Sequence, residues 1–188
     1  DPLVESLTPL MRYPGVFAHG SNDYEAPSLR NPLSYLLSPS KPQHGHRLDT
    51  ERMTKAFESG GWLNLNNRGG ELTVSGLRIG FIGLDDAHDG KDDVSSIPAQ
   101  VSSQTAIDLR IAVTHAPYLR LIELFTEADA SVIFAGHTHG GQVCLPGNRA
   151  LVTNCDLPTR HARGLSAWSF GGKNSILNVC AGLGTSIF

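Results

Sequence analysis

The chain lacks several features that would place it in a familiar class of protein. It carries 15 Lys and Arg against 18 Asp and Glu, a net charge of −3, with no basic run. That balance argues against a nucleic-acid-binding module, which would normally show a basic face. No apolar stretch approaches the length of a transmembrane helix, and no signal peptide is recognisable. Three cysteines, Cys144, Cys155 and Cys180, form no C-x-x-C pair, which argues against a thiolate zinc site and a disulfide framework.

What is present fits a globular protein. The 188 residues are 40% hydrophobic and 18% charged, enough for one sizeable core. We find no internal repeat, no low-complexity segment and no linker that would divide the chain. The sequence therefore predicts a single domain over residues 1–188.

Apolar periodicity predicts short strands that alternate with helices, the pattern of an α/β protein. Asp49 or Thr50 caps one expected helix and Gly60 ends it, while Ser75 and Gly76 form the turn of an expected hairpin. The expected helices cover residues 2–13, 49–62, 98–106 and 118–129, with one helical turn within 30–37. The expected strands lie within 15–20, 70–86, 108–117, 131–141, 141–146, 150–154 and 175–186.

Histidines follow two of the expected strands directly. His137 and His139 lie in "AGHTHGGQ" (135–142), and His115 ends the strand "DLRIAVTHAP" (108–117). Imidazole is the commonest side-chain metal ligand, and ligands bind beyond the carboxyl ends of strands in α/β sheets. The flanking glycines let the backbone turn sharply. The three histidines therefore predict a metal site.

Other polar segments follow strands in the same way. "GSNDY" (20–24) can supply oxygen ligands or form an ordinary turn. "LDDAH" (84–88) either contributes Asp85, Asp86 and His88 to the site or is a solvated acidic loop. In "AGLGTS" (181–186), backbone N–H groups at Gly182 and Gly184 can cradle a phosphate.

In that order, "GSNDY", "VTHAP" (113–117) and "GHTHGGQ" (136–142) resemble the later motifs of the calcineurin-like metallophosphoesterases. With "ARGLS" (162–166) and "AGLGTS", the chain resembles more narrowly the bacterial branch of small phosphodiesterases that includes YaeI-like and YkuE-like proteins. The resemblance implies an α/β sandwich of two mixed sheets flanked by helices. It also implies hydrolysis of a phosphoester, expected to be a phosphodiester, by two divalent ions and a bridging hydroxide.

The resemblance assigns roles residue by residue. His115 and His137 would bind the second metal and His139 the first. "GSNDY" departs from the family's "GNHDY". Aligned without a gap, Ser21 replaces the metal-binding Asn and Asn22 the catalytic His; shifted by one, Asn22 keeps the ligand role and Asp23 replaces the His. Either register lacks the imidazole, a general acid worth about 10²–10⁴-fold, so turnover should be slow or limited to good leaving groups.

The family's D-x-H and G-D-x-x-D motifs are absent before residue 20, so we expect a fragment, incomplete at both ends, that lacks the N-terminal βαβ portion. Activity of this chain alone stays open. The alternative function is a non-catalytic or single-metal binding module that needs an N-terminal segment for activity. Mn, Fe, Zn or Co all suit the ligands. The expected substrate is a small or lipid or cell-envelope phosphoester; the compartment, cytoplasmic or membrane-associated, and an upstream membrane anchor stay open.

Overall fold

A six-stranded mixed sheet dominates the computed structural model, which describes residues 2–26, 45–145 and 149–182. The strand order is β3-β4-β5-β6-β10-β9. The four central strands run parallel, and β3 and β9 pair antiparallel at the two edges. The strands are β3 (Gly70–Val74), β4 (Leu77–Gly83), β5 (Leu109–Val113), β6 (Val132–Ala135), β9 (Gly164–Phe170) and β10 (Lys173–Val179).

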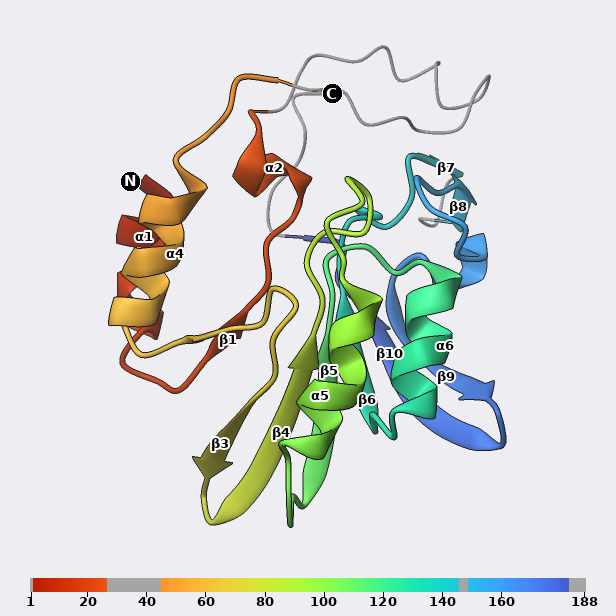
Figure 1. Ribbon diagram of the computed structural model, residues 1–188. Coiled ribbons are helices and arrows are strands. Elements are labelled where there is room, and N and C mark those ends of the chain that lie inside the picture. The colour runs from red at the N-terminus through yellow and green to blue at the C-terminus, as the bar shows by residue number, and fades with distance from the viewer. Residues whose placement is uncertain (1, 27–44, 146–148, 183–188) are drawn as a thin grey trace.

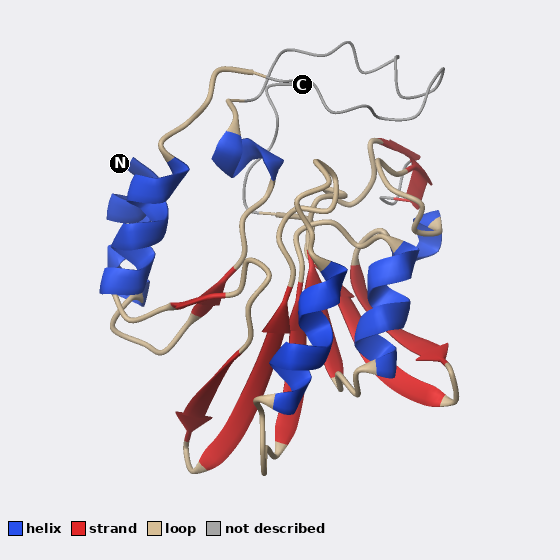
Figure 2. Cartoon of the chain, in the orientation of Figure 1, coloured by secondary structure: helices blue, strands red, loops and turns tan. Residues whose placement is uncertain are grey.

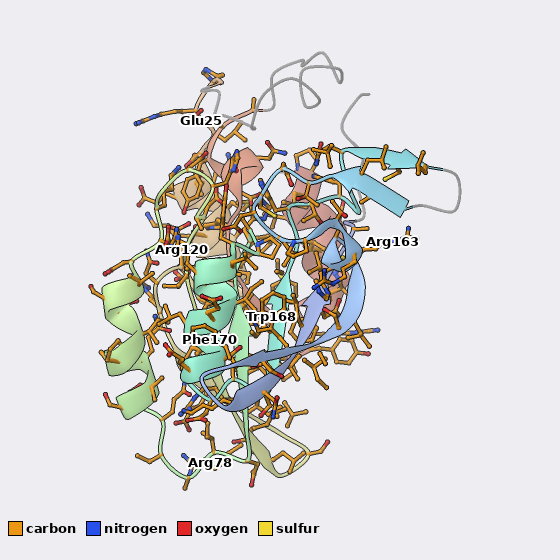
Figure 3. The ribbon with its side chains drawn as sticks, turned by 90° about the vertical axis from the view of Figure 1, so that its right-hand side faces the viewer. Glu25, Arg78, Arg120, Arg163, Trp168 and Phe170 are labelled. Atoms are coloured by element: carbon orange, nitrogen blue, oxygen red, sulfur yellow. The ribbon has the colours of Figure 1, made fainter. Side chains whose placement is uncertain are left out.

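Two helices, α5 (Ile97–Ser102) and α6 (Leu119–Glu127), lie together in front of this sheet in Figure 1. The spacing of Leu121, Ile122 and Phe125 puts all three on one side of α6, and each is fully buried. They pack with Ile133 and Leu177 of the sheet into the main core. Trp168 of β9, labelled in Figure 3, packs against this core.

The N-terminal part forms a smaller unit beside β3 and β4 (Figure 1). Its elements are α1 (Pro2–Leu7), the 3-10 turn η1 (Thr8–Leu10), β1 (Val16–Phe17), α2 (Ser21–Tyr24), α4 (Thr50–Ser59) and β2 (Leu63–Asn64). β1 and β2 form a parallel two-stranded sheet. Phe17, Met53 and Phe57 make a separate small core, and Asp49 caps α4 by accepting a hydrogen bond from the backbone N–H of Arg52.

The expected α/β class, with a mixed sheet flanked by helices, is confirmed (Figure 2). The expected sandwich has two mixed sheets. The described residues form one large sheet, which has six strands. The remaining strands make two-stranded sheets, β1–β2 and the antiparallel pair β7 (Val143–Leu145) with β8 (Arg149–Val152). The single-domain expectation stays a prediction.

Most of the expected elements occur, with local corrections. The helix expected over 2–13 becomes 3-10 at Thr8, because Pro9 cannot donate the backbone hydrogen bond that an α-helix needs. "SNDY" is a helical turn rather than a loop. The pattern did not predict β2 or β9. The turn expected within 30–37 lies outside the described residues. None of the described helices is long and apolar enough to cross a membrane.

Candidate functional site

Three neighbouring parallel strands end at the same edge of the large sheet. β4 leads into Asp85 and Asp86, β5 into His115, and β6 into His137. The ladder continues past the strands, since the backbone N–H of Gly136 donates to the carbonyl of His115 at 2.8 Å. The loops that carry these side chains lie along the upper edge of the sheet in Figure 1. The topology thus gathers the polar residues that follow the strands.

His115 and His137 face each other directly. Nδ1 of His137 lies 3.1 Å from Nε2 of His115, and the ring centroids are 4.9 Å apart at an angle of 73°. Two nitrogens on one ion, at bonds of about 2.0–2.1 Å and angles of about 90–110°, lie about 2.9–3.4 Å apart. The observed spacing therefore suits two ligands of one metal, and equally a hydrogen bond between two neutral imidazoles.

The "GHTH" turn is held in an uncommon conformation. His137 and His139 have φ values of 64° and 52°, in the left-handed region that non-glycine residues rarely adopt. The side-chain amide of Asn154 donates to the carbonyl of His137 at 2.9 Å. Between the histidines, the fully buried Thr138 donates its hydroxyl to the carbonyl of Ala162 at 2.6 Å. These contacts fix the turn that aims His137 at His115.

Burial keeps both facing imidazoles neutral. Desolvation, followed by repulsion from His115, lowers the pKa of His137 to about 2. Desolvation also lowers the pKa of His115, although the carboxylates of Asp86 and Asp23 oppose the shift. Nε2 of His137 is buried without a hydrogen-bond partner. Neutral imidazoles with available lone pairs are the form that binds a metal.

Gly20, which precedes helix α2, packs directly against the ring of His115. A Cβ placed on Gly20 would lie 2.4 Å from the ring of His115, so only glycine fits there. Ser21 donates its hydroxyl to Oδ2 of Asp86 at 2.8 Å, whereas Asn22 is exposed. Oδ2 of Asp23 accepts the backbone N–H of Gly20 at 2.8 Å. Ser21 is therefore one of two residues of "SNDY" that contact an acidic side chain after β4, and Tyr24 is the other.

The "LDDAH" loop reaches the histidines. The ring centroid of His88 lies 4.5 Å from that of His137, and its Nδ1 lies 3.0 Å from the hydroxyl of Tyr118. Asp86 is fully buried, and Asp85 accepts the hydroxyl of Tyr24 at 2.7 Å. The loop is thus packed into the site.

The remaining candidates lie further from the pair or cannot be placed. His139 is exposed, yet close enough for its charge to lower the pKa values of His115 and His137. Gly182 donates its backbone N–H to Sγ of Cys180 at 3.3 Å, and Gly184 lies outside the described residues. Among the residues that can be described, no three His, Cys, Asp or Glu side chains are arranged to hold a metal.

Sequence reasoning missed three polar side chains that support the site, Tyr24, Tyr118 and Asn154. Each contacts its partner across a gap of many residues, so no local spacing signals it. Two positions offered a hint: Tyr24 lies within "GSNDY", and Tyr118 directly follows "VTHAP".

Comparisons with known proteins add little to this geometry. No family model matches the chain, and no curated protein matches it. Among solved structures, the chain is similar to the NAD nucleotidase NadN of Haemophilus influenzae, with 20% sequence identity and a TM-score of 0.41. The match covers 61% of this chain and 24% of that one, so the chain spans about a quarter of that structure's length.

Proposed function

We propose that the chain carries the histidine-rich part of a metal-dependent phosphoesterase site, acting on a phosphodiester. The observation that supports this most directly is the 3.1 Å spacing of Nδ1 of His137 and Nε2 of His115. Both rings are held neutral by burial, and they lie at the carboxyl ends of parallel strands, where α/β folds bind ligands. The motif resemblance adds the reaction class.

The residues present fit part of such a centre. His115 and His137 would hold one divalent ion of Mn, Fe, Zn or Co, with Asn22 as a further ligand, and His139 would hold a second ion. Bound ions of this kind polarise phosphoryl oxygens and lower the pKa of bound water. With Nδ1 of His137 facing the ion, Nε2 would carry the hydrogen of the neutral ring, and no described residue accepts a hydrogen bond from it.

The other residues of the site would bind and orient the phosphoester. Asp86 orders the segment through Ser21, and Asn22 or Asp23 would take the place of the missing catalytic imidazole. Backbone N–H groups near Gly182 and Gly184 would contact the phosphate. The substrate class, a small or a lipid or cell-envelope phosphoester, belongs to the same proposal.

Metal binding and hydrolysis by the chain test this function together. Isothermal titration with Mn²⁺ and hydrolysis of bis-p-nitrophenyl phosphate are measured on the wild type, His137→Ala and His137→Asn. Asn tolerates the left-handed backbone, so the last variant keeps the turn while it removes the imidazole. We expect weak binding and slow Mn²⁺-dependent turnover in the wild type, both lost in the two variants. Turnover that persists in His137→Asn would overturn the proposal.

A second candidate function is a single-metal or metal-free binding module. The arrangement of the described residues favours it, because no three His, Cys, Asp or Glu side chains converge there. Neutral ligands without a carboxylate leave the charge of the cation uncompensated, which weakens binding. Metal binding that is lost in His137→Asn, with no hydrolysis above a metal-only control, would select this module over the enzyme.

A further inference from the structure

We propose that His88 donates a hydrogen bond from Nε2–H to a phosphoryl oxygen bound at the histidine cluster, and that Tyr118 is the positioning residue that fixes this tautomer. The inference rests on the proposed function and deepens it. It assigns an imidazole to the substrate from a loop other than "SNDY", where the family's imidazole is missing.

His88 lies beside the facing pair of histidines. Its ring centroid lies 4.5 Å from that of His137, at an angle of 45°, and His137 in turn contacts His115. His137 therefore contacts both other imidazoles, and the three rings come from loops that follow three neighbouring strands. An anion held beside the facing pair lies within reach of the His88 side chain.

The contact with Tyr118 sets which nitrogen of His88 carries the proton. The planes of the phenol and the imidazole are inclined by only 17°, their centroids are 6.5 Å apart, and the hydroxyl lies 3.0 Å from Nδ1, so the two rings meet edge to edge. Burial raises the pKa of Tyr118 to about 12, so the hydroxyl keeps its proton and can donate it. When Nδ1 accepts this bond, the neutral ring carries its hydrogen on Nε2. No hydrogen bond from the described part of the chain reaches Nε2 of His88.

The loop that carries His88 is held in place from several sides. Oδ1 of Asp86 accepts a hydrogen bond from the backbone N–H of His88 at 3.1 Å. The backbone carbonyl of Asp86 accepts one from the backbone N–H of Lys91 at 2.9 Å. Arg120 of α6 clamps Asp92 with two hydrogen bonds. A donor fixed before the ligand arrives costs little reorganisation, which is the requirement for effective binding of an anion.

The tautomer is measured first, by heteronuclear NMR of isotope-labelled histidine in the wild type, Tyr118→Phe and Tyr24→Phe. Tyr24→Phe is the matched control, because it removes a hydroxyl bonded to Asp85 in the same loop. We expect hydrogen on Nε2 of His88 in the wild type and the control, and a shift toward hydrogen on Nδ1 in Tyr118→Phe. Hydrogen on Nδ1 in the wild type would overturn the proposal, since Nε2 would then be an acceptor suited to a metal.

Binding of inorganic phosphate to the Zn²⁺-loaded protein is the second measurement. Measured at saturating Zn²⁺ in each variant, His88→Ala should weaken phosphate binding by about tenfold or more, because a hydrogen bond to a charged group is lost. His88→Gln keeps an N–H donor and should recover part of the loss. Unchanged phosphate affinity in His88→Ala would overturn the inference. A wild type that binds no Zn²⁺ contradicts the proposed function instead, and the tautomer measurement still decides the role of Tyr118.

Discussion

His137 concentrates several unfavourable features in one residue. It is not a glycine, yet its backbone is left-handed. Its imidazole is half-buried, and its Nε2 has no hydrogen-bond partner among the described residues. A left-handed conformation costs about 1–2 kcal/mol for an ordinary residue. Such strain persists where surrounding contacts impose it, and it clusters at functional sites. Here Asn154 holds the backbone carbonyl of His137. His137 is thus held in a left-handed conformation that lowers the stability of the chain.

The depressed pKa of His137 predicts acid sensitivity. The unfolded chain takes up a proton on this imidazole below about pH 6.5, whereas the folded chain does so only near pH 2. The unfolded state therefore binds more protons in this window, and the free energy of unfolding falls as the pH falls, by about 1.4 kcal/mol per pH unit for one such group. Urea unfolding from pH 7 to pH 4 measures the slope.

His137→Asn should flatten this pH dependence, because the group that titrates only in the unfolded chain is removed. His46→Gln, which changes an exposed histidine, is the control and should leave the slope as in the wild type. An equal slope in His137→Asn and wild type would contradict the assignment.

At the scale of elements, helix α2 packs close to the end of β5 because Gly20, the residue before it, has no side chain. Gly20 has an extended backbone, so its role is steric: a Cβ there meets the His115 ring at 2.4 Å. Ser21 and Tyr24 then bond to Asp86 and Asp85. The contacts connect α2 with the loop after β4.

Gly20→Ala should displace the ring of His115 and weaken Mn²⁺ binding by tenfold or more, on the order of 1.4 kcal/mol. Gly136→Ala is the matched control next to His137. An added Cβ at that position meets only the carbonyl of His115, at 3.8 Å. Titration calorimetry on both variants makes the comparison, with thermal unfolding to check that each is folded. Equal Mn²⁺ affinity in the two variants would show that His115 does not need its present position.

At the scale of the whole molecule, α5 and α6 cover one face of the large sheet. The two faces of the sheet differ in exposure. On β10, Leu177 is fully buried and Ile176 is 50% exposed; on β6, Ile133 is fully buried and Phe134 is 43% exposed. Both faces of β6 are apolar, a pattern typical of parallel strands that are covered on both sides, whereas Ile176 shares its face of β10 with Asn174 and Asn178.

Leu177→Ala should therefore lower the free energy of unfolding by about 2–5 kcal/mol, since it leaves a cavity in the main core. Ile176→Ala, one residue earlier on the same strand, should cost less than about 1 kcal/mol, because half of that side chain is already exposed. Urea unfolding of the isolated chain compares the two. A loss as large for Ile176 as for Leu177 would show that its face is covered in solution.

The sequence by itself determined the local elements. Asp49 and Gly60 bound α4, Ser75 and Gly76 turn the β3–β4 hairpin, and apolar runs that stop at His115 and His137 mark strand ends, because capping, turn chemistry and periodicity act over a few residues. Tertiary structure decided which strands became neighbours. It set Nδ1 of His137 against Nε2 of His115, and it brought His88 to His137, Tyr118 to His88 and Ser21 to Asp86. Those contacts join residues far apart in the chain, and only packing of the sheet and its helices fixes such distances.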